Sequence, residues 1–172
     1  MNKTTLFTAV ILTFGLFAAQ AADKVLFEDS SFSKEGWSEY AEISGTGGWE
    51  VKRRELGELV QTVVQEVTLE GSGGIFLSAG ESSYASVFRS EGVIYAMRSR
   101  NGEQALVGQA DVNGKAELRL GFDGAFLIYE YRSGGKWSRL GKSDIIGVVS
   151  YTGGISTPNR ADGMSGYRVV EL

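Results

Sequence analysis

The chemistry open to this sequence is limited first by what is missing from it. The 172 residues include no histidine and no cysteine. A Ser-His-Asp triad, a cysteine nucleophile, a histidine general base and an ordinary zinc site each need one of these residue types. Carboxylates therefore remain as the main reactive groups, and pairs of carboxylates suit the hydrolysis of glycosidic bonds.

One pair of carboxylates has the spacing of neighbours on a strand face. Glu66 and Glu70 belong to the stretch EVTLE, and on a strand both would point to the same side, with Thr68 between them. The stretch runs directly into the turn residues GSGG. We therefore name Glu66 and Glu70 as catalytic candidates, and a solvated strand face is the alternative.

Two turns offer clustered oxygen atoms. They are DVNG, with Asp111 and Asn113, and NRADG, with Asp162. Such oxygens bind calcium, but neither turn has the longer ligand spacing of a recognisable calcium loop. Asp and Asn beside Gly are also ordinary turn residues. Calcium is thus the one metal that we consider, with plain turns as the alternative.

The N-terminus predicts export. Lys3 precedes the apolar run LFTAVILTFGLFAA, and the small residues AQA follow at 19–21, as in a signal peptide cleaved after Ala21. The run is shorter than the roughly 20 residues that a spanning helix needs. We expect a signal peptide at 1–21, one domain at 22–172 without a membrane span, and a secreted or periplasmic location. An exported domain without cysteine suits a bacterial envelope.

The charge balance argues against nucleic acid. The formal net charge is −4, and no basic cluster is longer than KRR at 52–54. Affinity for phosphate backbones comes mainly from concentrated positive charge, so we expect no nucleic-acid partner.

The elements that must position these residues are predicted to be strands. The chain has 24 glycines and a single proline, and turn signals such as SEG, NG, DG and SGG separate short runs rich in Val, Ile, Tyr and Phe. This pattern is typical of a β-sandwich or barrel. The stretch 54–67 also fits a helix, but its Val and Thr content favours a strand with Leu59, Val63, Val67 and Leu69 on one face.

Hairpins dominate the middle of the chain. A two-residue loop at Asp123-Gly124 would pair Leu118 with Tyr129 on a core face and leave Arg119 and Glu130 on the opposite face. The loops SEG at 90–92 and NG at 101–102 divide the preceding residues into two sets. One holds Ala85, Val87, Val93, Tyr95, Met97 and Leu106; the other holds Tyr84, Ser86, Phe88, Ile94, Ala96, Arg98 and Val107.

A mixed apolar and charged face is either covered by loops or used for a ligand. As ligand-binding candidates we name Tyr84, Arg98, Arg119, Glu130 and Trp137. Trp37, Trp49 and Trp137 each follow Gly or Gly-Lys near a turn. A ring there caps the core edge or stacks on a sugar.

The order of these segments resembles a known family. The stretches LFEDSSFSKEGW, IYAMRSRNGE, AELRLGFDGAFLIYEYRSGGKW and the terminal GYRVVEL are similar to the concanavalin A-like lectin/glucanase jelly roll, in the style of laminin-G-like secreted bacterial modules. The resemblance implies two packed antiparallel sheets, an early strand beside the last strand, and often sugar binding on the concave face.

A second resemblance concerns EVTLE alone. It is similar to the E-x-D-x-E strand of family 16 glycoside hydrolases, in which Glu66 would correspond to the nucleophile and Glu70 to the acid/base. Thr68 replaces the central Asp and cannot supply its charge.

Three functions follow. The first is a secreted, non-catalytic carbohydrate-binding module for a glycan or polysaccharide. The second is a glycosidase-like enzyme, and the third is a structural or adhesion domain that binds a protein partner.

Overall fold

The protein is built from strands. The structure, a computed structural model, describes residues 23–40, 50–57, 62–80, 82–146, 151–157 and 163–172. Every regular element in these ranges is a β-strand, which confirms the predicted all-β class. The predicted signal peptide, Trp49 and Asp162 lie outside the described residues. Across those ranges, no helix is long and apolar enough to cross a membrane.

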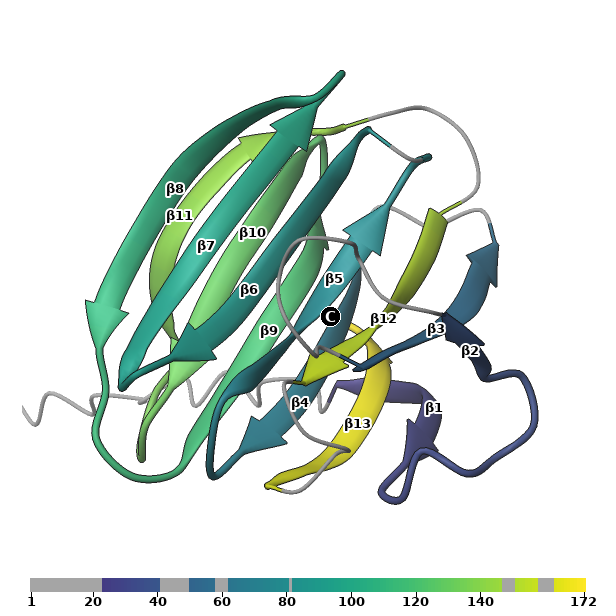
Figure 1. Cartoon of the computed structure of the whole chain (residues 1–172), viewed down its shortest axis with the longest axis horizontal. Helices are drawn as coiled ribbons and strands as arrows, with labels where there is room; N and C mark the ends of the chain where they lie inside the picture. Colours follow the sequence, from purple (N-terminus) through teal and green to yellow (C-terminus); the bar gives the residue numbers. More distant parts are fainter. Residues whose placement is uncertain (1–22, 41–49, 58–61, 81, 147–150, 158–162) are drawn as a thin grey trace, which may run out of the picture.

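The strands form two antiparallel sheets, packed as a sandwich (Figure 1). Sheet A has six strands, in the order β1 (Lys24–Asp29), β13 (Met164–Glu171), β4 (Val63–Leu69), β9 (Ala116–Asp123), β10 (Phe126–Arg132) and β11 (Ser138–Asp144). Sheet B has seven, in the order β2 (Ser38–Tyr40), β3 (Glu50–Gly57), β12 (Tyr151–Thr157), β5 (Gly73–Ser78), β6 (Tyr84–Ser90), β7 (Val93–Arg100) and β8 (Glu103–Asp111).

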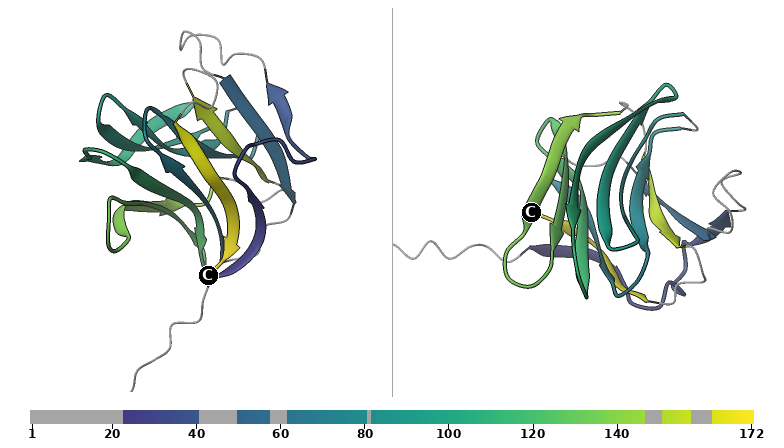
Figure 2. Two further views of the ribbon diagram at one scale, coloured as in Figure 1. Left: turned by 90° about the horizontal axis from the view of Figure 1, so that it is seen from below. Right: turned by 60° about the vertical axis from the view of Figure 1, so that its left-hand side comes forward.

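The first and last strands of the fold lie side by side. β1 pairs with β13 in antiparallel register, with Glu28 opposite Arg168, and Figure 2 shows the two strands together in both views. The pairing agrees with the expectation from the jelly-roll resemblance that an early strand lies beside the last one.

The core lies between the two sheets. Alternate residues of a strand point to opposite faces, and in β6 Ala85 and Val87 point inward and are fully buried. From sheet A, Leu118, Leu120 and Leu127 close the other side. Apolar alternation in both sheets is therefore the feature of the sequence that drives the sandwich.

The stretch 54–67 is extended where the structure describes it, so the strand prediction is confirmed there. It does not form one strand, however, because β3 ends at Gly57 in sheet B and β4 starts at Val63 in sheet A. Val63, Val67 and Leu69 share one face, as predicted, and are buried in the core, while Leu59 lies outside the described residues. The chain crosses between sheets within this stretch, which a local pattern of apolar residues does not reveal.

The predicted loop of the 116–137 hairpin is displaced by one residue. Phe126 pairs with Asp123, so the loop is Gly124-Ala125 and not Asp123-Gly124. Gly124 has a φ of 65°, a conformation that glycine adopts without strain. The register moves by two residues, which preserves the side of every residue. Arg119 and Glu130 are therefore on the outward face, as predicted, and lie directly opposite each other.

The predicted faces around the 90–92 loop are wrong. Ser90 pairs with Val93, so the loop has two residues, Glu91 and Gly92. Both have positive φ, 50° and 82°, as in the hairpin turns that match the twist of the strands. A loop shorter by one residue than the predicted SEG turns every side chain of β7 to the other face. Tyr95 and Met97 therefore join Tyr84 on the outward face.

The sandwich closes on one side where β8 meets β11. A Cβ atom on Gly108 would lie 2.2 Å from the backbone oxygen of Leu140, and one on Gly141 would lie 2.6 Å from Cγ1 of Val107. Glycine thus permits contact between the edge strands of the two sheets.

Gly108→Ala is expected to lower the free energy of unfolding by about 1–3 kcal/mol, because a backbone oxygen cannot rotate away from the new methyl group. Gly71→Ala is the matched control, since no heavy atom lies within 4 Å of its would-be Cβ. Urea denaturation of both variants measures the effect. Equal stability of the two variants would show that β8 and β11 do not touch at this point.

Candidate functional site

The two outward faces of the sandwich differ in chemistry. The outward face of sheet A, here called the charged face, centres on Glu66, Arg119 and Glu130. The outward face of sheet B, here called the aromatic face, carries Phe76, Tyr84, Phe88, Tyr95, Met97 and Leu106.

The charged face carries a row of alternating acids and bases across all six strands of sheet A. Successive partners in the strand registers are Glu28, Arg168, Glu66, Arg119, Glu130 and Arg139. Opposite charges on directly opposed strand positions stabilise a sheet. The row brings together residues from six separate parts of the chain.

Glu66 lies at the centre of this row and is 2% exposed. Its Oε1 accepts a hydrogen bond from Nε of Arg119 at 2.7 Å, and its Oε2 accepts one from Nε of Arg168 at 2.5 Å. Both carboxylate oxygens are therefore held by guanidinium groups. Glu70 is exposed, beyond the end of β4. This geometry gives Glu66 a structural role and does not favour the pair as an acid and a nucleophile.

The neighbouring charges are paired in the same way. Oε1 of Glu130 accepts a hydrogen bond from Nε of Arg139 at 3.0 Å, and its Oε2 lies 3.7 Å from Nη1 of Arg119. The ring of Trp137 lies over the guanidinium of Arg119, 4.2 Å from Cζ to the ring centroid, and also over Arg132 at 4.6 Å. Three predicted ligand residues, Arg119, Glu130 and Trp137, thus meet on one face, where they contact one another.

The remaining predicted ligand residues lie elsewhere. Arg98 shares the inward face of β7 with Ile94 and Ala96, and its Nε is buried without a hydrogen-bond partner among the described residues. Burial raises the pKa of the core phenol Tyr129, and the charge of nearby Arg98 partly offsets that rise. Tyr84 lies on the aromatic face. The five candidates therefore do not form the single surface that the sequence predicted.

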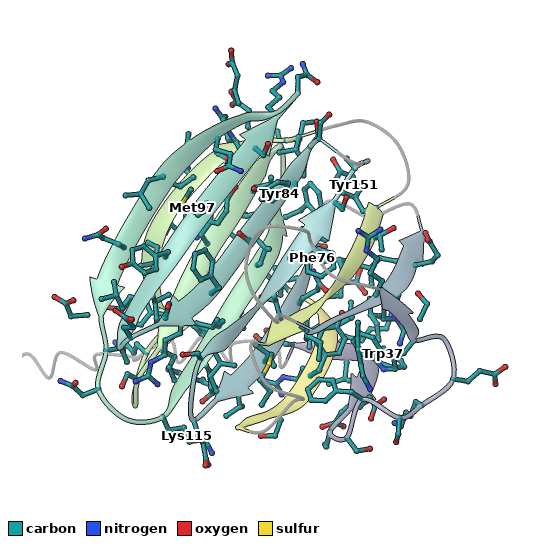
Figure 3. All side chains as sticks on the ribbon, in the orientation of Figure 1. Trp37, Phe76, Tyr84, Met97, Lys115 and Tyr151 are labelled. Atoms are coloured by element: carbon teal, nitrogen blue, oxygen red, sulfur yellow. The ribbon has the colours of Figure 1, made fainter. Side chains whose placement is uncertain are left out.

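The aromatic face presents rings from three neighbouring strands. Figure 3 shows Phe76, Tyr84 and Met97 on the outward side of β5, β6 and β7. Phe88 and Tyr95 are opposed on adjacent strands and stack, with ring centroids 5.4 Å apart and an angle of 27° between planes. Leu106 is 53% exposed beside Met97. The alternation along β7 already separates Tyr95 and Met97 from Ile94 and Ala96, but the mistaken loop length grouped the two residues with Ala85 and Val87.

Two glycines allow close approach to Phe88 and Phe76. A Cβ on Gly74 would lie 2.4 Å from Cβ of Phe88, and a Cβ on Gly154 would lie 2.8 Å from the ring of Phe76. The ring of Phe76 therefore lies where an outward side chain of β12 would otherwise stand, and β6 approaches β5 closely at Phe88. The hydroxyl of Tyr84, at the edge of the surface, accepts a hydrogen bond from Nε2 of Gln104 at 2.8 Å. Burial raises the pKa of Tyr84, so the phenol keeps its proton at neutral pH.

A pocket adjoins the far end of sheet B. It measures about 480 Å³ and is lined by Gly36, Trp37, Ser38, Arg53, Arg54, Glu55 and Thr152. Trp37 is held there by Asp29, whose Oδ2 accepts a hydrogen bond from the indole Nε1 at 2.9 Å. The sequence indicates Trp37 as a residue near a turn, but its closeness to the arginines of β3 arises only from the pairing of β2 with β3.

Asp29 is almost fully buried, with 1% of its surface exposed. Its Oδ2 also accepts a hydrogen bond from the backbone N–H of Lys34 at 2.7 Å, and its Oδ1 accepts one from that of Ser31 at 3.0 Å. Burial alone raises the pKa of this carboxyl, but these hydrogen bonds outweigh it, and the pKa lies below its ordinary value of 3.8. Asp29 therefore fixes the loop that carries Trp37.

The calcium candidates are only partly within the structure. Asp111 ends β8, and Asn113 follows in an exposed loop, while Asp162 lies outside the described residues. Among the residues that are described, no group of three or more acidic side chains is placed to hold a metal ion. Calcium at Asp111, Asn113 and Asp162 stays a prediction.

Comparison with known proteins places the fold. No protein-family model matches the sequence. A curated relative, "Conserved virulence factor B" of Staphylococcus saprophyticus, is 30% identical over 66 residues, which are 38% of this chain and 22% of that protein. This partial match does not define a family.

Two solved structures are similar over most of the chain. The GH43 BlXynB protein from Bacillus licheniformis has a TM-score of 0.56 at 15% identity, over 83% of this chain and 39% of that one. Xyloglucan PUL GH43B of Bacteroides ovatus has a TM-score of 0.55 at 9% identity, over 84% and 38%. The chain thus spans about two fifths of each protein. At this identity the likeness shows the fold alone, a β-sandwich that also occurs in carbohydrate-active proteins.

Proposed function

We propose that this protein is a secreted, non-catalytic carbohydrate-binding module of the concanavalin A-like jelly-roll class. In this proposal residues 1–21 are a cleaved signal peptide, and residues 22–172 form a single binding domain. The ligand is a polysaccharide that lies across the aromatic face. The outward rings of β5, β6 and β7, among which Phe88 stacks on Tyr95, are the observation that carries the proposal.

The chemistry of the aromatic face suits a sugar chain. The apolar face of a sugar ring stacks on an aromatic side chain, and hydroxyl groups at its edge need a few polar partners. Phe88 and Tyr95 supply the stacked surface, and the neutral phenol of Tyr84 supplies a donor. Neighbouring strands repeat at about 4.8 Å, so the rings of adjacent strands offer successive contacts to one extended ligand.

The charged face is less suited to a ligand than the aromatic face. Its carboxylates and guanidinium groups already pair with one another, and a ligand that competed for them would leave buried charges without partners. The two GH43 proteins of similar fold are carbohydrate-active by name. These names support a sugar as the ligand. Glu66 has both carboxylate oxygens hydrogen-bonded to arginines, which favours binding without catalysis.

Isothermal titration of the purified protein with soluble xyloglucan, xylan and mixed-linkage glucan tests the proposal. At least one polysaccharide should bind, and Tyr95→Ala should weaken it about tenfold or more, as expected for a central aromatic contact. Phe126→Ala is the matched control, because it removes a ring that is 41% exposed on the charged face. A protein that binds none of the polysaccharides, or an equal loss in both variants, would contradict the proposal.

A further inference from the structure

The pocket beside the aromatic face contains a positive charge without a counter-ion. Cζ of Arg54 lies 3.4 Å from the ring centroid of Phe27 and 5.9 Å from that of Trp37. Its Nε and Nη1 are buried and make no hydrogen bond to any described residue. No carboxylate of the described residues forms an ion pair with this side chain. A cation in such surroundings is stabilised by an anion that approaches from solvent.

The guanidinium of Arg54 is accessible from the pocket through its Nη2 atom. Nη2 of Arg54 is not among the buried, unbonded atoms, and it lies 3.8 Å from the position that a Cβ of Gly36 would take. Gly36 and Arg54 both line the pocket. Gly36 has a φ of 98°, and the absence of a side chain there leaves the guanidinium open to the pocket.

The other walls suit a sugar ring. Trp37 is half-buried, and its ring is fixed by Asp29 and by an edge contact with Tyr167 at 4.9 Å. The hydroxyl groups of Ser38 and Thr152 line the same space. Glu55 is the acid of the pocket, and one of its oxygens accepts a hydrogen bond from Thr152 at 3.3 Å.

The pocket is also continuous with the aromatic face. Arg53 points outward from β3, opposite Gly154, which is in turn opposite Phe76. The guanidinium of Arg53 lies 6.0 Å from the ring of Phe76. Arg53 thus belongs both to the aromatic face and to the pocket wall, whereas Arg54, the next residue of β3, points to the inward side and meets the pocket at the edge of the sheet.

We propose that this pocket binds the anionic group of an acidic sugar, which Arg54 recognises and Trp37 stacks against. The inference rests on the proposed carbohydrate-binding function and adds the class of sugar. A guanidinium pairs with the planar carboxylate of a uronic acid or with a sulfate ester, so both sources share the same recognition chemistry.

Titration calorimetry with matched ligands tests the proposal. The pairs are xylo-oligosaccharides with and without a glucuronic acid branch, and the small probes are glucuronate and glucose 6-sulfate. The branched oligosaccharide should bind about tenfold more tightly or better, as expected for a charge-assisted contact. This advantage should fall with added salt. Stronger binding of glucuronate identifies a carboxylate site, and stronger binding of the sulfate identifies a sulfate site.

Arg54→Gln should remove the advantage of the acidic ligand and leave binding of the neutral oligosaccharide unchanged. Arg100→Gln is the control, because Arg100 is an exposed arginine at the end of β7, next to the Asn101-Gly102 turn. Arg54→Lys keeps the charge without the planar fork and should retain part of the advantage, which covers the case in which glutamine unfolds the protein.

The outcomes separate the two proposals. Equal binding of neutral and acidic oligosaccharides by the unaltered protein would overturn the acidic-sugar pocket and leave the carbohydrate-binding function in place. No binding of either oligosaccharide and of either small probe would overturn both. Binding of glucuronate or glucose 6-sulfate without any oligosaccharide would support the pocket and contradict a polysaccharide site on the aromatic face.

Discussion

Glu66→Ala is expected to lower the free energy of unfolding by about 3–5 kcal/mol, the range found when one partner of a buried ion pair is removed. Glu66 is nearly inaccessible and bonds to Arg119 and Arg168 with its two oxygens. Truncation leaves both guanidinium groups without this partner on a face where Arg119 itself is 8% exposed. The loss should therefore exceed that from any exposed ion pair of the protein, for which about 0–1 kcal/mol is typical.

Chemical denaturation at neutral pH measures the change. Glu28→Gln is the matched control, because Glu28 occupies the first position of the same row, is exposed, and forms no ion pair with Arg168, its partner in the strand register of the described residues. It should alter stability by no more than about 0.5 kcal/mol. Similar small effects from both substitutions would mean that the row of charges does not stabilise the sheet.

Asp29→Ala is expected to cost about 3 kcal/mol, because hydrogen bonds to a buried charged acceptor each contribute about 1.5–3 kcal/mol and the change leaves several donors unpaired. The donors are the backbone N–H groups of Ser31 and Lys34 and the indole of Trp37. Asp29→Asn retains the shape of the side chain but loses one acceptor oxygen, so it should lie between the alanine variant and the natural protein. Because Asp29 fixes Trp37, both variants should also shift the fluorescence of that indole.

The contribution of Asp29 depends on pH in a defined direction. Its pKa is lowered in the folded protein from the ordinary value of 3.8, so the unfolded chain binds a proton more readily than the folded one. The stabilisation is complete above 3.8 and is lost as the pH falls below it toward the folded pKa. The stability difference between the natural protein and Asp29→Ala should therefore shrink on acidification through this window. A difference that grows instead would refute the assigned hydrogen bonds.

The two outward faces explain why a mixed pattern of apolar and charged residues was ambiguous in the sequence. In β9 and β10 such a pattern belongs to a sheet whose charges pair across strands, as Arg119 and Glu130 do. In β6 and β7 it belongs to a sheet that carries rings, as Phe88 and Tyr95 do. Both faces contain residues that a ligand could use, but only the pairing of distant strands shows which charges already have partners.

Local errors in the prediction had unequal consequences. The predicted loop lies one residue before the observed loop at 124–125. This error shifts the strand register by two residues, so Leu118 and Arg119 keep their predicted faces. At 91–92 the loop was one residue shorter than predicted, and Tyr95, Met97 and Arg98 all changed sides. Strand alternation has a period of two, so an odd error exchanges core for surface, and an even error does not.

From the sequence alone came the all-β class, the approximate location of the hairpins, the shared face of Val63, Val67 and Leu69, and the exclusion of histidine and cysteine chemistry. These follow from residue type and from alternation along a single strand, which are local properties. The tertiary structure alone decided that β3 and β4 belong to different sheets, that Glu66 lies between Arg119 and Arg168, and that Arg54 adjoins Trp37 in a pocket. Each of these depends on pairing between segments far apart in the chain. The energy of that pairing depends on both partners and cannot be inferred from either segment alone.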